Sequence, residues 1–183
     1  MEEDIFYMRE AKLWSERSQC LSRHVGTVLV RDGRIISAGA NGPSSGIPRC
    51  EYRDDKGQYN LQQNPELVCP RKRMGFKSGE GTEHCVAVHA EINSIMQAAR
   101  MGISTKGTTL YCYCGTPCKD CTKEIIQSGI KRVVCLGKSG STFAPIKDGD
   151  NPNKKDYNFP IAERLFELAG VQLDVISEEE VMM

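Results

Sequence analysis

Apolar side chains recur at helical spacing over residues 4–20, where Tyr7, Ala11 and Trp14 would share one face. A second apolar stripe runs through residues 89–101, at positions i, i+3, i+4 and i+7. Two shorter helices are predicted in segments that end before a glycine, which readily adopts the left-handed conformation found after a helix. These segments are residues 118–128 and 160–169.

Strands are predicted where β-branched residues concentrate. The first two, residues 25–30 and 35–38, flank Asp32-Gly33 and so form a hairpin. Because helices alternate with strands after residue 89, the later strands should be parallel and joined by right-handed crossovers. The pattern therefore predicts an α/β fold with a five-stranded mixed sheet flanked by helices. The later strands are predicted at residues 108–114, 131–136 and 171–176.

Turn-forming residues dominate residues 41–81. A chain of 183 residues favours one domain, residues 1–183, and about 40 residues without regular structure are unusual inside a compact domain. Something other than an apolar core should therefore hold this insertion, which we place at residues 42–82. A polar loop is predicted at residues 138–158, and the acidic tail, residues 177–183, is predicted to fray.

The chain carries 24 basic and 24 acidic side chains, so its formal net charge is zero. No overall basic field is available to attract nucleic acid, which argues against a nucleic-acid partner. No apolar run approaches the roughly 20 residues that span a bilayer. The acidic start, residues 1–4, lacks the features of a signal peptide. We therefore expect a soluble, cytoplasmic protein with no membrane partner.

Nine cysteines stand out in this composition. Their odd number argues against a disulfide framework and favours metal ligation or catalysis. Cys118 and Cys121 lie three residues apart at a predicted helix start, so their thiolates share one face of the first turn. His89 opens the preceding predicted helix. One histidine and two cysteines give three protein ligands and leave a fourth position for water, as in catalytic zinc sites.

Glu91 follows His89 by two residues and does not share its direct face. This position suits a side chain that faces a zinc-bound water rather than the zinc. Either motif alone also occurs outside catalytic sites: PCxxC is found in structural zinc knuckles and redox pairs, and HAE could be a capped helix with a surface acid. Their occurrence on successive helix starts favours the catalytic interpretation, in which Glu91 moves protons as general base and acid.

Three stretches of the sequence carry a family resemblance. They are SQCLSRHVGTVLVRDGRIISAGANGPSSG at 18–46, EHCVAVHAEINSIMQAAR at 83–100 and GTTLYCYCGTPCKDCTKEIIQSGIKRVV at 107–134. With these stretches the sequence resembles the zinc-dependent cytidine/deoxycytidylate deaminase family, in its deoxycytidylate branch of phage and bacterial type. The resemblance implies the three-layer α/β/α cytidine-deaminase fold. It also implies hydrolytic deamination of dCMP to dUMP and ammonia, which supplies dUMP for thymidylate synthesis.

The resemblance further implies substrate contacts and regulation. Asn41 and Ala90 match positions that contact the substrate, although Asn41 before a glycine is also what a plain turn requires. The family implies a homo-oligomer, commonly a hexamer, that dCTP activates and dTTP inhibits, each triphosphate with Mg²⁺. Ala40 stands where the family usually has an aromatic residue, and Thr27 where it often has alanine. The first departure is expected to weaken the effector response.

Four further cysteines bracket the irregular insertion and could hold a second, structural zinc that closes it. Family members with such a zinc have cysteines at the positions of Cys20 and Cys50. Their other ligands vary, so His84 is an alternative to a cysteine as the third or fourth zinc ligand. The alternative is that these cysteines are buried or free thiols. The four are Cys20, Cys50, Cys69 and Cys85. The other three, Cys112, Cys114 and Cys135, fall within predicted strands and are interpreted as core residues.

Several alternatives stay open on the sequence alone. The same chemistry could act on dCTP, a free nucleoside or a base in nucleic acid. A non-catalytic zinc-stabilised module is a different class, and the presence of Glu91 with all three ligands argues against it. The cationic runs Arg71-Lys72-Arg73 and Lys154-Lys155 could contact a phosphate. Such runs are more often solvated, so the phosphate ligands stay unassigned.

Overall fold

The computed structural model describes residues 2–54, 58–59, 67–77, 80–137 and 159–183. Its centre is a five-stranded sheet with the strand order β2-β1-β5-β6-β7. Strand β1 pairs antiparallel with β2 and β5, whereas β5, β6 and β7 are parallel. The predicted five-stranded mixed sheet is therefore confirmed, including its parallel half. The strands are β1 (Gly26–Arg31), β2 (Arg34–Ala40), β5 (Thr109–Cys112), β6 (Arg132–Leu136) and β7 (Gln172–Ile176).

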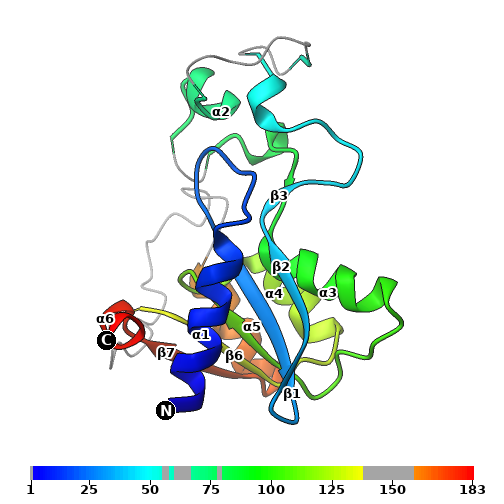
Figure 1. The fold of residues 1–183 in the computed structure, drawn as a ribbon, viewed down its shortest axis with the longest axis vertical. Coiled ribbons are helices and arrows are strands. Elements are labelled where there is room, and N and C mark those ends of the chain that lie inside the picture. The colour runs from blue at the N-terminus through cyan, green and yellow to red at the C-terminus, as the bar shows by residue number, and fades with distance from the viewer. Residues whose placement is uncertain (1, 55–57, 60–66, 78–79, 138–158) are drawn as a thin grey trace.

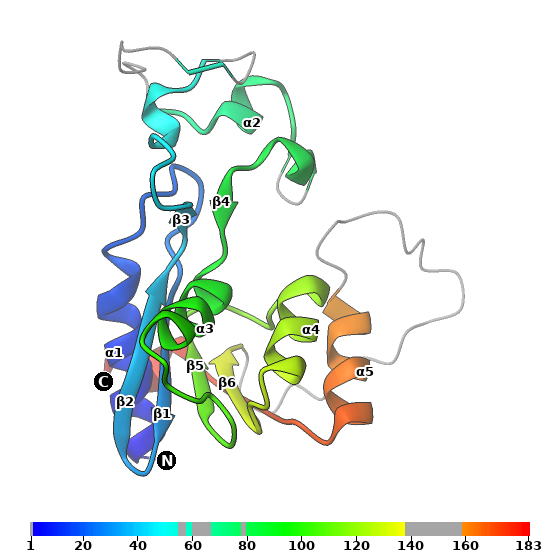
Figure 2. The ribbon, with the colours of Figure 1, turned by 90° about the vertical axis from the view of Figure 1, so that its right-hand side faces the viewer.

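Helices cover both faces of the sheet (Figures 1 and 2). Helices α1 and α6 lie on one face, and α3, α4 and α5 lie on the other. A buried apolar cluster that includes Tyr7, Val28 and Val181 fills the first interface, and a second that includes Leu29 and Phe166 fills the other. The molecule is thus a three-layer α/β/α sandwich, as predicted. The helices are α1 (Glu2–Ser15), α3 (Ala90–Arg100), α4 (Lys119–Gln127), α5 (Phe159–Ala169) and α6 (Glu178–Met182).

Two glycines allow helices to approach the sheet closely. A Cβ atom at Gly26 would lie 2.1 Å from the carbonyl oxygen of Ala11 in α1. On the other face, a Cβ atom at Gly39 would lie 2.4 Å from the carbonyl oxygen of Ala90 at the start of α3. Any larger residue would push the helix away, so Gly39 determines how deeply the start of α3 packs against β2.

The predicted fraying of the acidic tail is wrong, because Glu178–Met182 forms α6. Ser177 Oγ accepts a hydrogen bond from the Glu180 amide, and the Glu180 carboxylate accepts one from the Ser177 amide. The Val181 side chain is buried, and its carbonyl oxygen accepts a 2.8 Å bond from Arg9 Nε. A capping box and a buried valine therefore order this acidic segment.

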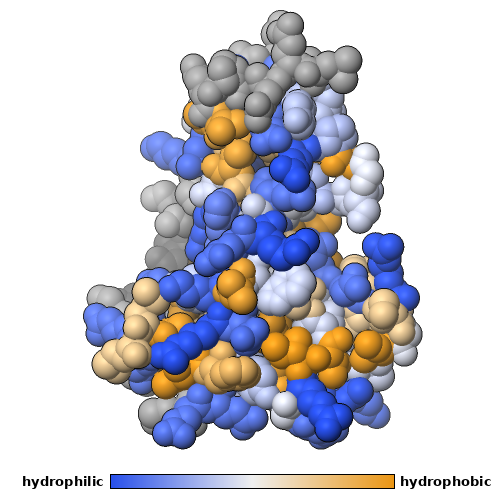
Figure 3. All heavy atoms as spheres, in the orientation of Figure 1, coloured by the Kyte–Doolittle hydropathy of each residue, from blue (hydrophilic) through white to orange (hydrophobic). Residues whose placement is uncertain are grey.

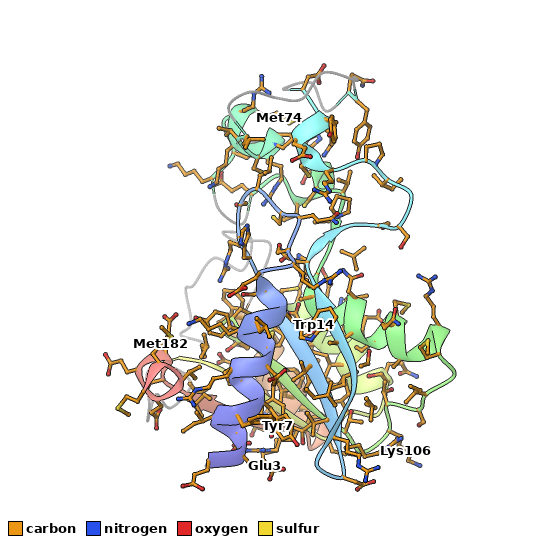
Figure 4. The ribbon with its side chains drawn as sticks, viewed as in Figure 1. Glu3, Tyr7, Trp14, Met74, Lys106 and Met182 are labelled. Atoms are coloured by element: carbon orange, nitrogen blue, oxygen red, sulfur yellow. The ribbon has the colours of Figure 1, made fainter. Side chains whose placement is uncertain are left out.

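The described residues between 41 and 88 contain more regular structure than predicted, although each of their elements is short. They form a lobe beyond one end of the sheet (Figure 1), where Met74 lies (Figure 4). Strand β3 pairs with β4, directly ahead of His89, and so joins the lobe to the start of α3. The elements of this region are β3 (Gly42–Pro43), η1 (Cys50–Tyr52), α2 (Pro70–Arg73), η2 (Thr82–His84) and β4 (Ala87–Val88). The polar loop predicted at residues 138–158 lies outside the described residues.

No helix within the described ranges is long and apolar enough to cross a membrane.

A network of charged side chains joins α1 to the parallel strands. The Arg132 guanidinium on β6 donates to the Asp4 carboxylate at 2.7 and 3.1 Å and to Asp174 at 2.6 Å. The Tyr111 hydroxyl also donates to Asp4, at 2.8 Å, and its ring lies 5.1 Å from that of Tyr7, labelled in Figure 4. The hydrogen bond from Arg132 is the main cause that lowers the pKa of Asp4. Asp4 thus links α1 to the sheet through charge-assisted hydrogen bonds.

Replacing Asp4 with asparagine should lower the free energy of unfolding by about 1–3 kcal/mol near pH 7, because a charge-assisted hydrogen bond is lost. Since the folded pKa of Asp4 lies below its ordinary value of 3.8, this contribution is present above that value. It disappears as the pH falls through the folded pKa. Thermal unfolding should therefore separate Asp4→Asn from the wild type near pH 7 and much less at about pH 2.

The control is Glu167→Gln, which removes an exposed ion pair with Arg164 and should change stability by less than about 1 kcal/mol. A stability difference for Asp4→Asn that stays undiminished in acid would contradict the assignment.

Candidate active site

Two helices begin at the same edge of the sheet. Helix α3 precedes β5 in the chain, and α4 follows β5. The N-termini of both helices therefore lie near the C-terminal end of β5 (Figure 2). His89 occupies the N-cap of α3 and Cys118 that of α4, both with extended backbone. Neither side chain caps its own helix. The two side chains are instead directed toward each other.

Histidine and cysteine donors converge at this point. The donor atoms of His89, Cys118 and Cys121 all lie within 4.8 Å of one another. His89 Nδ1 is 3.2 Å from Cys121 Sγ and 3.5 Å from Cys118 Sγ. Zinc bonds of about 2.0 Å to nitrogen and 2.3 Å to sulfur, at a tetrahedral angle, separate such donors by about 3.5 Å. The three side chains therefore fit a zinc ion.

Hydrogen bonds within this donor set shift the pKa values of the three side chains in different directions. The bond from the Cys121 thiol, followed by that from the His89 ring, lowers the pKa of Cys118 to about 4. The bond to Cys118 raises the pKa of Cys121, as does burial, and a bond to Cys118 raises the pKa of His89. Cys118 is therefore the more readily ionised of the two thiols, and a metal ion would release thiol protons on binding.

Glu91 lies in the first turn of α3 and is only 4% exposed. Burial raises the pKa of its carboxyl group, and the neighbouring His89 charge opposes this shift. One carboxylate oxygen also lies within 4.8 Å of the sulfur atoms of Cys112 and Cys114. A carboxyl group with a raised pKa exchanges protons more readily near neutral pH than an exposed one.

The donor set opens into a pocket of about 570 Å³. Glu91, Ala90 and Asn41 line it together with the three donors. The Asn41 side chain also orders the preceding loop, because Oδ1 accepts from Ser18 Oγ at 2.6 Å and Nδ2 donates to the Arg23 carbonyl at 2.8 Å. Asn41 has no positive φ angle. The Asn41 side chain therefore has a structural role in the preceding loop, in addition to its place in the pocket lining.

Cys114 is not the core residue that the sequence predicts. Strand β5 ends at Cys112, and Cys114 beyond it is half-buried and lines the pocket, with its sulfur 3.2 Å from that of Cys112. Cys112 and Cys135 are fully buried in β5 and β6, as predicted. The early end of β5 therefore converts one predicted core thiol into a pocket residue.

Of the four remaining cysteines, Cys50 lies within electrostatic range of the other three, which are Cys20, Cys69 and Cys85. Cys50 and Cys69 are buried, whereas Cys20 and Cys85 are half-buried and line the pocket. Burial raises the pKa of Cys50 to about 11, and the charges of the other three thiols act in the same direction. Among the described residues, the groups close enough to form a metal site do not include these four.

His84, the rival ligand for the second zinc, is engaged elsewhere. Its ring stacks on Phe76 with centroids 5.4 Å apart, and its Nε2 atom lies 3.7 Å from the Glu83 carboxylate. His84 thus contacts Phe76 and Glu83 in this structure.

Two polar side chains that the motifs do not include hold the start of α3. Thr27 Oγ1 on β1 donates to the Ala90 carbonyl at 2.9 Å, and Asn93 Nδ2 donates to the Ala40 carbonyl at 2.7 Å. The sequence signal for Thr27 is its departure from the alanine common in the resembled family. No sequence pattern marks Asn93, because a polar residue on a helix is normally solvated.

A nitrogen and sulfur donor set with an unused coordination position is typical of catalytic rather than structural zinc, and a buried glutamate beside it is typical of zinc deaminases. The family model for the cytidine and deoxycytidylate deaminase zinc-binding region matches residues 1–137. The chain therefore belongs to this family of zinc-dependent deaminases.

The chain is similar to several known deoxycytidylate deaminases. It is 38% identical over 140 residues to the deoxycytidylate deaminase of Enterobacteria phage T4, a match that covers 68% of this chain and 72% of that protein. It is 36% identical over 132 residues to the deoxycytidylate deaminase of Schizosaccharomyces pombe, covering 72% of this chain and 36% of that protein. The match thus spans little more than a third of the yeast relative's length.

A solved structure supports the fold over nearly the whole chain. The dCMP deaminase from cyanophage S-TIM5, in complex with dCMP and dUMP, superposes with a TM-score of 0.60 at 24% identity and covers 93% of each chain. At this identity the likeness establishes the cytidine-deaminase architecture rather than the substrate.

Proposed function

We propose that the protein catalyses the hydrolytic deamination of dCMP to dUMP and ammonia, with zinc held by His89, Cys118 and Cys121. The observation that carries the proposal is the buried Glu91 beside the three donors, at the base of a pocket that can hold a nucleotide. The names of the relatives support dCMP as the substrate. The nine unpaired cysteines support a cytoplasmic location, because thiols stay reduced there.

In this proposal Glu91 moves protons at three points of the reaction. When bound, zinc lowers the pKa of a coordinated water towards neutrality. Glu91 accepts the proton of the attacking water and delivers it to N3 of the cytosine ring, which makes C4 more electrophilic. The water oxygen bonds to C4 as a hydroxyl group, and Glu91 then transfers the remaining hydroxyl proton to the amino group. The bond from C4 to the exocyclic nitrogen breaks, ammonia leaves and C4 becomes the carbonyl carbon of uracil. Asn41 and Ala90 are proposed to orient the nucleotide in the pocket.

Replacing Glu91 with glutamine should reduce dCMP turnover by at least ~10²–10⁴-fold, because an amide cannot accept the water proton. Zinc content should persist, since the three ligands remain. Ammonia release and metal analysis of the same preparation measure the two effects. Glu124→Gln is a matched control, because Glu124 is an acid of the pocket wall outside the donor set, and it should keep most of the activity. Loss of zinc from Glu91→Gln would show that Glu91 is a ligand.

We further propose that residues 1–183 form one deaminase domain and that a second zinc, held by four cysteines in and beside the lobe, orders the insertion at residues 42–82. The described part of the lobe has few buried apolar side chains, so a metal would replace the missing core. The gathering of three cysteines around Cys50 supports the proposal. The proposed ligands are Cys20, Cys50, Cys69 and Cys85.

Metal analysis of protein purified without chelators should give two zinc ions per chain. Cys50→Ser should reduce this number to one while the catalytic zinc stays bound. Cys135→Ser is the control, because Cys135 is a buried cysteine on β6 that lies outside both donor sets, and it should keep two zinc ions. A single zinc in the wild type that survives Cys50→Ser would remove the second site.

We also propose that the protein is a homohexamer regulated by dCTP as activator and dTTP as inhibitor, each with Mg²⁺. Large apolar side chains on three outer helices support self-association; they are Phe6 and Leu13 on α1, Met96 on α3 and Leu168 on α5. On the face shown in Figure 3, hydrophobic side chains reach the surface mainly over the half that holds the sheet. The pairing of β3 with β4 connects residues 42–43 to the start of α3 and offers a route from an effector to the site.

A dCMP saturation curve, measured alone and with each triphosphate plus Mg²⁺, tests the regulation. A triphosphate that binds away from the zinc can act only if it prefers one of two states of the assembly. The curve should be sigmoidal alone and closer to hyperbolic with dCTP. The response should be modest because Ala40 lacks an aromatic surface. A hyperbolic curve that neither triphosphate changes would contradict the regulation and leave the catalytic proposal intact.

A further inference from the structure

The cationic triplet of the lobe is split by the fold. Arg71 is buried, with 9% exposure, and lines the pocket that holds the zinc donors. Its neighbours Lys72 and Arg73 on the same short helix, α2, are exposed. The sequence gives no reason to distinguish the three side chains, whereas the structure directs one of them to the reaction site.

The Arg71 side chain is held in place and acts on the zinc-binding region. Its Nη1 atom donates to the carbonyl oxygen of Glu80 at 2.7 Å, across the turn that follows α2. Arg71 lines the same pocket as His89 and Cys118. The hydrogen bond to Cys118 raises the pKa of His89, and the charge of Arg71 opposes this shift, so the guanidinium lies within electrostatic range of the donor set. Arg71 is thus an anchored cation on the lobe side of the pocket.

The positions of the other charged side chains in the pocket indicate that an anion would bind on the lobe side. Asp120 and Glu124 belong to α4, so they would repel a phosphate on that wall. Glu83 also lines the pocket, but its side chain is 67% exposed and faces His84. Arg23 is the other arginine of the lining, and it is exposed.

We propose that Arg71 binds the phosphate of the nucleotide and so selects a nucleoside monophosphate over the free nucleoside. This inference rests on the proposed deamination of dCMP. The phosphate lies at the opposite end of that nucleotide from the amino group that leaves, which matches a cation on the lobe side with the zinc donors below it. A planar guanidinium can donate two parallel hydrogen bonds to a phosphate, and partial burial strengthens them.

The test compares Arg71→Gln with Arg73→Gln, which removes the same charge from the exposed face of α2. The zinc-loaded proteins are assayed for ammonia release from dCMP and from deoxycytidine. Binding of dUMP and of deoxyuridine is measured by calorimetry, which requires no turnover. Arg71→Gln should weaken dUMP binding and lower kcat/KM for dCMP by about 10- to 100-fold, mainly through KM. The nucleosides should be affected much less, and Arg73→Gln should resemble the wild type.

Arg71→Lys separates phosphate binding from a structural role, because it keeps the charge and loses the paired hydrogen bonds. It should fall between the wild type and Arg71→Gln on dCMP, and it decides the question if the glutamine variant does not fold. Equal losses on nucleotide and nucleoside, or no loss of dUMP binding, would overturn the proposal. A wild type that releases no ammonia from dCMP would instead overturn the proposed function.

Discussion

The close approach of α3 to the β1–β2 hairpin is the constraint on which the site depends. Gly39 leaves room for the Ala90 carbonyl, and Thr27 donates a hydrogen bond to the same oxygen. Because Ala90 stands between His89 and Glu91, this one contact positions both the nitrogen donor and the buried acid. The parallel pairing of β5 with β6 then places α4 beside α3, so the two cysteines meet the histidine at one edge of the sheet.

The chemistry of the site follows from the charges that this packing brings together. Three donors share buried space, and the hydrogen bond between the two thiols lowers the pKa of Cys118 and raises that of Cys121. A zinc ion held by His89, Cys118 and Cys121 would replace the thiol protons on binding. Glu91 is held beside the donors in an environment that disfavours its charged form. Burial raises the pKa of this carboxyl group, which favours proton exchange near neutral pH.

The sequence predicted the parts of the molecule that depend on local periodicity and spacing. The alternation of helices and strands predicted the mixed sheet, and the two motifs at helix starts predicted which donors would converge. The tail was predicted wrongly because α6 depends on Val181 packing against distant α1, which periodicity does not reveal. Cys114 was wrongly predicted as a core residue, because the sequence does not show that β5 ends at Cys112. Arg71 was left unassigned, because tertiary contacts set the direction of its side chain.

The central claim is that this site removes the amino group of a cytosine nucleotide with one phosphate. The most direct measurement is the formation of uracil products by the zinc-loaded protein from deoxycytidine, dCMP and dCTP, assayed side by side at equal concentration. The account predicts that dCMP is converted fastest, with water consumed and ammonia released in equal amounts. No conversion of any of the three, or a clear preference for deoxycytidine or dCTP, would contradict it.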